Sequence, residues 1–289
     1  MENNNTKLFR VQVVKPAKIS DNTIVKLTRQ GRRFAVEVFT IPSGSPIRRL
    51  GGNRYMRLKT GEVLEFKKSE ETKKGVLAIK KSMERLKGII RANFGEESHK
   101  ELHITLTYAE NMCDVDRLMF DFKNFVKRLK YELDKHKLEY VAVAEPQRRG
   151  AWHMHVLLKT TNQPKLYIEN DLMQKIWGHG FTKTKKIKVD DVGTYFMAYF
   201  CDLYTENGRK KGQRFHYYPK GMKFYRCSRG IVRPKAVEAV HGEVVKEYGT
   251  PVYESAVEVI GVEAGDVFRF SQKNEYKKNS NQRDGEGAG

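Results

Sequence analysis

The chain has 289 residues, of which 39% are hydrophobic and 31% charged; this is typical of a folded globular protein and argues against a disordered one. Lysine and arginine outnumber aspartate and glutamate by 55 to 35, so the net charge is +20. Such an excess favours a polyanionic partner such as nucleic acid, although a basic protein that merely stays soluble has the same balance.

The cysteines and the N-terminal segment indicate the compartment. Cys113, Cys201 and Cys227 are far apart and form no CxxC pair, which argues against a disulfide framework and a zinc ribbon. The segment Met1–Arg10 is polar, and no apolar run approaches the roughly 20 residues of a membrane helix. We therefore expect a cytoplasmic protein without a membrane partner.

Residues 1–95 are predicted to form an accessory N-terminal region. Short alternating runs at Val11–Val14 and Phe34–Phe39 are followed by a helical pattern near its end. The apolar positions of this helix fall at three- and four-residue steps and share one face: Val76, Ile79, Met83, Leu86 and Ile90. Lysines and arginines crowd the rest of the helix, which is either the solvated side of a packed helix or a surface that faces DNA.

Residues 96–204 show the clearest pattern. Strands are predicted at 102–108, 139–145, 152–158 and 181–188, and helices at 114–137, 168–177 and 192–204. The order β-α-β-β-α-β-α resembles a ferredoxin-like or RRM-like α+β fold, in which helices cover one face of an antiparallel sheet.

Residues 205–270 are predicted to be a basic C-terminal extension. Between Asn207 and Lys235, ten lysines and arginines occur without an acidic residue, and aromatic residues lie among them. This mixture suits single-stranded nucleic acid, whose bases stack and whose phosphates pair with cations, and it equally suits a basic loop packed by ordinary aromatics. We expect short strands over 244–270 and a disordered polar tail over 271–289.

Two histidines within the strand at 152–158 are candidate metal ligands. Side chains alternate across a strand, so His153 and His155 project to the same face. A lone histidine there would be a packed or surface residue, whereas two imidazoles on one face can share a cation. Thr105 and Thr107 on the strand at 102–108 also alternate with apolar residues and would form a polar floor for such a site.

Glu145 is a candidate third ligand. If Arg148-Arg149-Gly150 is the turn, residue 147 faces residue 151 and Glu145 lies directly opposite His153. A three-residue hairpin needs a left-handed residue at its end, and Gly150 meets that need. Two imidazoles and one carboxylate suit Mg²⁺ or Mn²⁺, with zinc as an open alternative.

Tyr195 and Tyr199 are candidate nucleophiles on the helix at 192–204. Four residues apart, they share one face, and core tyrosines beside the stripe of Val192, Phe196 and Phe200 would show the same spacing. Beside a metal-bound phosphate, a phenolate could attack a phosphodiester, leaving a phosphotyrosine link and a free 3′-hydroxyl.

These features together resemble the HUH endonucleases, and more narrowly the rolling-circle replication initiators of plasmids and single-stranded DNA phages. Three motifs stand in the family's order over roughly a third of the chain: Leu102–Tyr108, the run from Glu145 to His155, and the YxxxY helix. The run Trp177-Gly178-His179-Gly180-Phe181 is also similar to the family.

The resemblance implies metal-dependent nicking of single-stranded or hairpin origin DNA, a 5′-phosphotyrosine link and later strand rejoining. It implies His153, His155 and Glu145 as ligands and the two tyrosines as nucleophiles. We interpret the basic residues near these motifs as DNA contacts: Arg148, Arg149, Lys185 and Lys186. No GxxxxGK[ST] motif is present, so a host helicase or a supercoiled template is expected to separate the strands, with a host DNA polymerase as a further partner.

One departure from the family leaves the nucleophile open. Many relatives carry a lysine three residues after each tyrosine, where this chain has Ala198 and Asp202. Lys185, Lys186 or Lys188 would then supply that charge, with a slight preference for Tyr199 as nucleophile. Two alternatives stay open: a relaxase or transposase of the same superfamily, and a non-catalytic sequence-specific DNA-binding protein.

Overall fold

The computed structural model describes residues 9–40, 47–52, 54–58, 60–65, 82–147, 149–187, 192–197, 203–204, 210–211, 217–219, 222–261 and 267–278. The chain divides into two compact units, one made of Met1–Glu71 with Pro234–Gly289 and the other of Thr72–Arg233.

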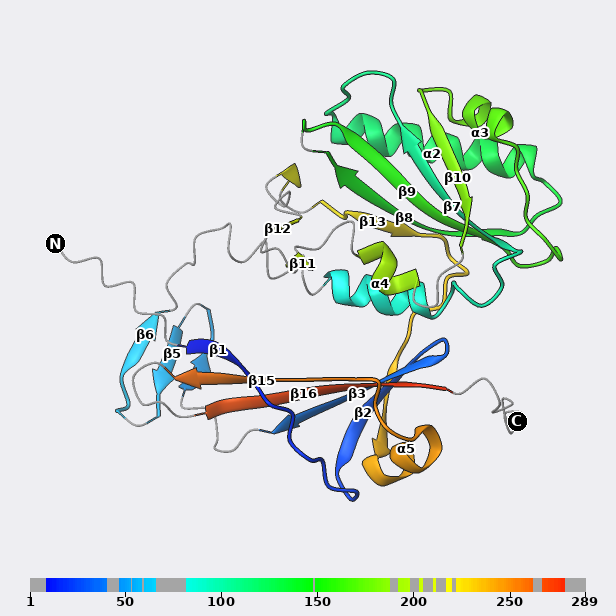
Figure 1. Ribbon diagram of the computed structural model, residues 1–289. Coiled ribbons are helices and arrows are strands. Elements are labelled where there is room, and N and C mark those ends of the chain that lie inside the picture. Colours follow the sequence, from blue (N-terminus) through cyan, green and yellow to red (C-terminus); the bar gives the residue numbers. More distant parts are fainter. Residues whose placement is uncertain are drawn as a thin grey trace. The chain divides into compact units, whose positions relative to one another are not determined.

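The second unit is built on a five-stranded antiparallel sheet (Figure 1). Its strands are β7 (Glu101–Thr107), β8 (Leu138–Pro146), β9 (Trp152–Thr160), β10 (Thr182–Lys186) and β13 (Tyr225–Cys227), in the order β10-β7-β9-β8-β13. Helix α2 (Val115–Glu132) connects β7 to β8, and α3 (Asn170–Trp177) connects β9 to β10. The four strands β7 to β10 thus have the order and connections of a ferredoxin-like sheet, which confirms the predicted α+β class.

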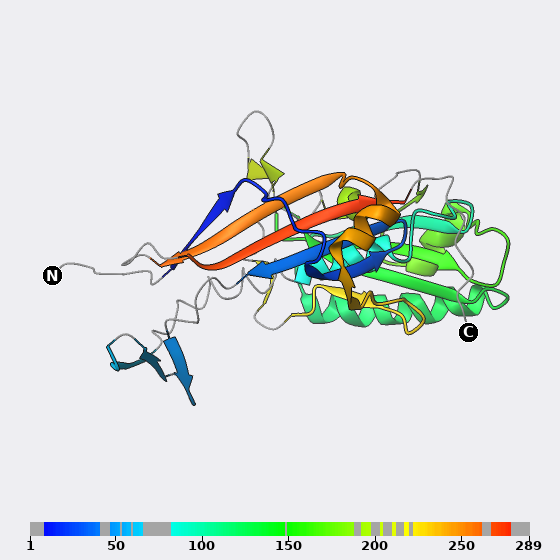
Figure 2. The same cartoon turned by 90° about the horizontal axis from the view of Figure 1, so that it is seen from below.

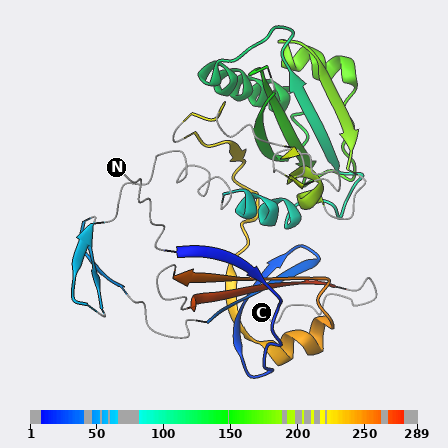
Figure 3. The same cartoon turned by 60° about the vertical axis from the view of Figure 1, so that its left-hand side comes forward.

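One face of this sheet packs against α2 and α3 (Figure 3). The inward residues of the strands, such as Ile104, Leu106 and Met154, contact Leu118, Phe125 and other apolar residues of the helices. Helix α2 begins where the Asp114 carboxylate accepts hydrogen bonds from the amides of Asp116 and Arg117, which satisfies donors that lack partners within the helix. This core holds the strands in register.

The opposite face is also partly covered, so the expectation of helices on one face only is wrong. Leu86 and Ile90, from a helix over residues 82–91, share a core with Val143, Leu157 and Val192. Val192 begins α4 (Val192–Met197). Sequence periodicity showed that Met83, Leu86 and Ile90 are apolar and aligned, but it could not show which face of the sheet they cover. Val76 and Ile79 of the predicted helix lie outside the described residues.

The first unit joins the two ends of the chain in a six-stranded antiparallel sheet (Figure 2). Its order is β1-β15-β16-β3-β2-β14. The strands are β1 (Phe9–Val14), β2 (Ile24–Gln30), β3 (Arg33–Thr40), β14 (Ala236–Val240), β15 (Tyr253–Gly261) and β16 (Val267–Lys277). Helix α5 (His241–Tyr248) contributes Val244 to a core with Phe34, Val36 and Tyr276. Strands β4 (Ile47–Leu50), β5 (Arg54–Arg57) and β6 (Val63–Glu65) form a separate three-stranded sheet.

This pairing of the chain ends departs from the expected boundaries at residues 95 and 205. Strand β1 pairs with β15, and β16 pairs with β3, across more than two hundred residues of sequence. Local patterns carry no information about such partners, because a strand's alternation shows its faces and not its neighbours.

Two further expectations are wrong in detail. Residues 271–277 belong to β16 and not to a disordered tail; the buried Gln272 side chain exchanges hydrogen bonds with the Ala17 backbone, so its polarity did not indicate exposure. Leu203 and Tyr204, predicted as the end of a helix, form β11, which pairs with β12 (Lys210–Lys211). Among the described residues, no helix has the length and apolar character needed to cross a membrane.

Candidate metal centre

The β8–β9 hairpin places Glu145 directly opposite His153. Its turn has the predicted form: the Gln147 amide donates to the Ala151 carbonyl over 2.7 Å, and Gly150 has a left-handed φ of 84°. A side chain at Gly150 would meet only ordinary contacts, so the glycine is required by the backbone conformation and not by lack of space. The predicted register, and with it the shared face of Glu145 and His153, is confirmed.

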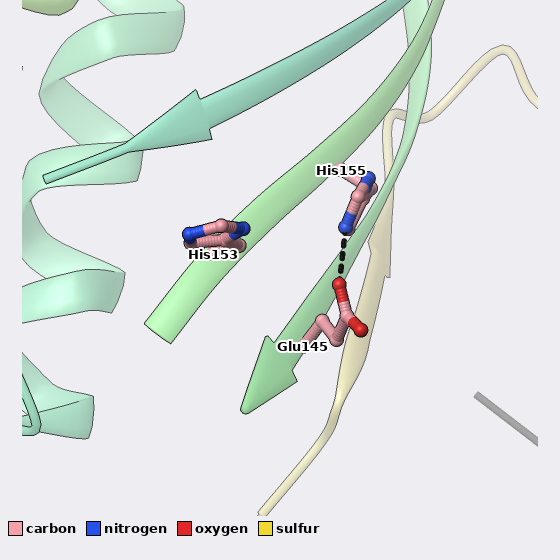
Figure 4. A group of neighbouring side chains, drawn as sticks. All are labelled: Glu145, His153 and His155. Carbon is pink, nitrogen blue, oxygen red and sulfur yellow. Dashed lines mark hydrogen bonds and ion pairs between the residues drawn. The ribbon is translucent and has the colours of Figure 1, made fainter. Parts of the chain in front are cut away.

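The side chains of Glu145, His153 and His155 form a cluster on that face (Figure 4). One ligand atom from each residue can be chosen so that all three lie within 4.8 Å of one another. Oε2 of Glu145 lies 2.6 Å from Nε2 of His155. Both side chains are largely buried, with 13% and 6% of their surface exposed, so the carboxylate and imidazole face each other in a partly desolvated environment.

The second ring nitrogen of His155 is held from behind by strand β7. Nδ1 lies 3.3 Å from Nε2 of His103 and 3.3 Å from the Thr105 hydroxyl. Burial, the nearby His155 and Lys185 together lower the pKa of His103 to about 4, so this imidazole is neutral at pH 7 and can accept a proton from Nδ1. Such a partner orients the ring and leaves Nε2 directed at the site.

His153 has a comparable partner within the hairpin. The side-chain amide of Gln147 lies 3.2 Å from Nδ1 of His153. An amide can present either its oxygen or its NH₂ group. When the oxygen accepts from Nδ1–H, the lone pair of Nε2 is available to a cation.

The donor set fits a divalent metal. Two imidazoles and one carboxylate leave coordination positions for water or phosphate oxygens, as a catalytic Mg²⁺ or Mn²⁺ requires, and zinc accepts the same ligands. Structural sites with four protein ligands, in contrast, leave no position for a substrate. The described residues Glu145, His153 and His155 are therefore suited to an open metal site.

The predicted DNA contacts have different positions. Lys185 stands opposite His103 and so lies on the ligand face of the sheet, whereas Lys186 stands opposite Leu102, on the other face. Both lysines are exposed, as is Arg149 in the turn. Arg148 and Lys188 lie outside the described residues.

Helix α4 connects the tyrosine motif to the same face as the ligands. Val192 packs against Val143 and Leu157, which alternate along their strands with Glu145 and His155 and so share their face. The backbone of Tyr195 belongs to α4. Its side chain, and the whole of Tyr199, lie outside the described residues.

Aromatic residues of the basic C-terminal segment have structural contacts where they are described. Phe224 is buried in the core of the second unit, and the Tyr218 hydroxyl donates to the Ala144 carbonyl over 2.7 Å. These two residues therefore follow the packing interpretation of that segment.

His103 and Gln147 were missed as partners of the ligands, although the sequence contained a signal for both. His103 alternates with Thr105 and Thr107, and position 147 alternates with Glu145. Each therefore lies on the ligand face. What alternation does not give is the distance between side chains, which depends on register and on rotamers.

Comparison with known families agrees with this geometry. Residues 101–203 match the family model of replication-associated protein ORF2, about a third of the chain. The match begins at β7 and includes all three candidate ligands, α4 and the segment around Phe181. Searches of curated proteins and of solved structures found no match. The family match supports a role in DNA replication, with DNA as the partner.

Proposed function

We propose that the chain is a rolling-circle replication initiator, a metal-dependent endonuclease and strand transferase of the HUH type that acts on origin single-stranded DNA. The observation that carries this proposal is the convergence of Glu145, His153 and His155 on the sheet face that also carries α4, within the segment that matches a replication-associated family.

In this proposal Glu145, His153 and His155 hold Mg²⁺ or Mn²⁺, which when bound polarises the scissile phosphate and stabilises its developing charge. Tyr195 or Tyr199 attacks the phosphorus atom through its phenolic oxygen and loses its proton to solvent. The bond from phosphorus to the 3′-oxygen breaks, and that oxygen takes up a proton to become a free 3′-hydroxyl.

The products retain the energy of the original bond. The 5′-phosphate is joined to tyrosine as a phosphodiester, so a later 3′-hydroxyl can attack the same phosphorus and release the tyrosine. The free 3′-hydroxyl primes synthesis by a host DNA polymerase, with a host helicase to unwind the template in the cytoplasm of a plasmid- or phage-bearing cell.

The direct test is a cleavage assay on single-stranded origin DNA with Mn²⁺ or Mg²⁺, read as protein-linked DNA on a denaturing gel. Wild type, Tyr195→Phe, Tyr199→Phe and the double variant are compared. We expect an adduct with wild type and none with the double variant. Loss of the adduct in one single variant identifies the nucleophile, and activity in both identifies interchangeable tyrosines.

His153→Ala is expected to abolish the adduct while largely sparing DNA binding. Equal loss of binding and cleavage would contradict the metal role of His153. If wild type binds the DNA and forms no adduct with any divalent metal, the endonuclease proposal is wrong and the chain is a DNA-binding module.

A further inference from the structure

A row of residues crosses the ligand face of the sheet and ends at an exposed aromatic ring. In β7, Thr107 is paired with His153, which is itself paired with Glu145. On the other side, the amide of Thr107 donates to the carbonyl of Phe181 over 2.9 Å, which places Phe181 opposite Thr107. Adjacent strands are about 4.8 Å apart, so Phe181 lies about 10 Å across the sheet from His153.

Phe181 is 65% exposed and is followed by two lysines that share its face. Lys183 stands opposite Thr105 and Lys185 opposite His103. Both lysines are exposed, on a strand at the edge of the sheet. A single exposed phenylalanine is common on protein surfaces, but this one is in line with the candidate ligands and beside two cations on the same face.

The segment that carries Phe181 is held rigidly from below. The buried Trp177 donates from Nε1 to the Thr107 carbonyl over 3.0 Å, and the Ala109 amide donates to the His179 carbonyl over 2.9 Å. Gly180 has a φ of 148°, and a Cβ there would collide with the backbone of Thr107, Tyr108 and Ala109. Close backbone contact therefore requires glycine at this position.

A second set of contacts secures the helix before this segment. Arg128 of α2 donates to the carbonyls of Ile176 and Trp177 at the end of α3, over 2.7 and 3.0 Å. Nε2 of His179 lies 3.5 Å from the buried carboxylate of Asp121. The exposed ring thus stands on a strand start that is tied to both α2 and β7, which limits the entropy lost when a ligand contacts it.

We infer that Phe181 is a stacking platform for a base of single-stranded DNA, with Lys183 and Lys185 contacting the phosphates beside it. An aromatic face beside cations is the chemistry that binds unpaired bases and the backbone that links them. This inference rests on the proposed function and names the part of its substrate site that lies next to the metal centre. Phe181 would position the strand whose scissile phosphate reaches Glu145, His153 and His155.

The test compares Phe181→Ala and Phe181→Trp with Phe120→Ala. Phe120 is 64% exposed and lies on α2, which covers the other face of the sheet, so it is a control matched in residue type and exposure. Affinity is measured by fluorescence anisotropy on labelled oligothymidylate of about 20 nucleotides at low salt in EDTA. We expect Phe181→Ala to weaken binding about 5- to 150-fold, the range of single-base stacking, and Phe181→Trp and Phe120→Ala to bind as wild type does.

Salt dependence separates stacking from phosphate contacts. Lys183→Ala and Lys185→Ala should each reduce the slope of log affinity against log salt by somewhat less than one, whereas Phe181→Ala should lower the affinity and leave the slope unchanged. A reduced slope for Phe181→Ala, or affinity equal to that of Phe120→Ala, would overturn the platform.

The outcomes distinguish this inference from the proposed function. If wild type binds DNA and forms the tyrosine adduct while Phe181→Ala matches wild type in affinity, only the platform is wrong. If wild type binds and Phe181→Ala weakens binding but wild type forms no adduct, the platform stands as part of a DNA-binding module. If wild type fails to bind single-stranded DNA, both are wrong.

Discussion

The Glu145 carboxylate contacts His155 over 2.6 Å, although the residue directly opposite Glu145 in the sheet is His153. The contact is therefore diagonal, across one step of the β8–β9 ladder, which a side chain as long as glutamate can reach. The diagonal places the carboxylate between the two imidazoles. It also makes each ligand depend on the register of the hairpin and on the partners that orient the rings.

Removal of the carboxylate should weaken metal binding. We expect Glu145→Gln to lower Mn²⁺ affinity by at least about 10- to 100-fold, since even loss of an outer partner has an effect of that size. Titration followed by the EPR signal of free Mn²⁺ measures the change. Glu132→Gln, at an exposed position on α2, is the control and should bind as wild type does; unchanged affinity in Glu145→Gln would remove Glu145 from the ligand set.

Gln147 is expected to act through His153. Gln147→Ala should reduce Mn²⁺ affinity about 10- to 100-fold by releasing the orientation of the His153 ring, with circular dichroism and DNA affinity unchanged. Gln174→Ala, at an exposed position on α3, provides the comparison. Equal metal affinity in the two variants would show that the 3.2 Å contact between Gln147 and His153 has no positioning role.

Gly150 should affect both stability and metal binding. Its left-handed backbone is unfavourable for alanine by about 1–2 kcal/mol, and relief of that strain would disturb the turn that sets the register of Glu145 against His153. Gly150→Ala is therefore expected to lower the urea midpoint and the Mn²⁺ affinity together. Gly249→Ala, at the end of α5 with a φ of 78°, should lower stability alone. If Gly150→Ala kept wild-type metal affinity, the centre would not depend on this turn.

Arg128 should stabilise the segment that leads into Phe181. Arg128→Ala removes two hydrogen bonds to the end of α3 and should lower the free energy of unfolding of this unit by roughly 1–2 kcal/mol, modest because the residue is exposed. Urea denaturation is the measurement, with the exposed neighbour Lys127→Ala as control. We also expect faster amide exchange at Phe181 in Arg128→Ala, and exchange equal to that of Lys127→Ala would contradict the coupling.

Local chemistry of the sequence predicted the site more closely than it predicted the fold around it. The alternation of His153 and His155, and a glycine suited to a left-handed turn, were enough to place Glu145 opposite His153, because a hairpin is a short-range structure whose register follows from its turn. The order of the four ferredoxin-like strands followed from the order of helices and strands. The polar strand β16 was missed, since its buried Gln272 and Asn274 are satisfied by hydrogen bonds to distant residues.

The sequence by itself determined which residues share a strand face, where the hairpin turns and which donors could hold a metal; these are properties of neighbouring residues and of backbone geometry. Only the tertiary structure decided that the two chain ends pair in one sheet, that His103 and Gln147 lie against the ligand imidazoles, and that Phe181 ends the row that contains His153. These relationships join residues that are far apart in sequence, or depend on rotamers, and the packing of the whole unit selects them.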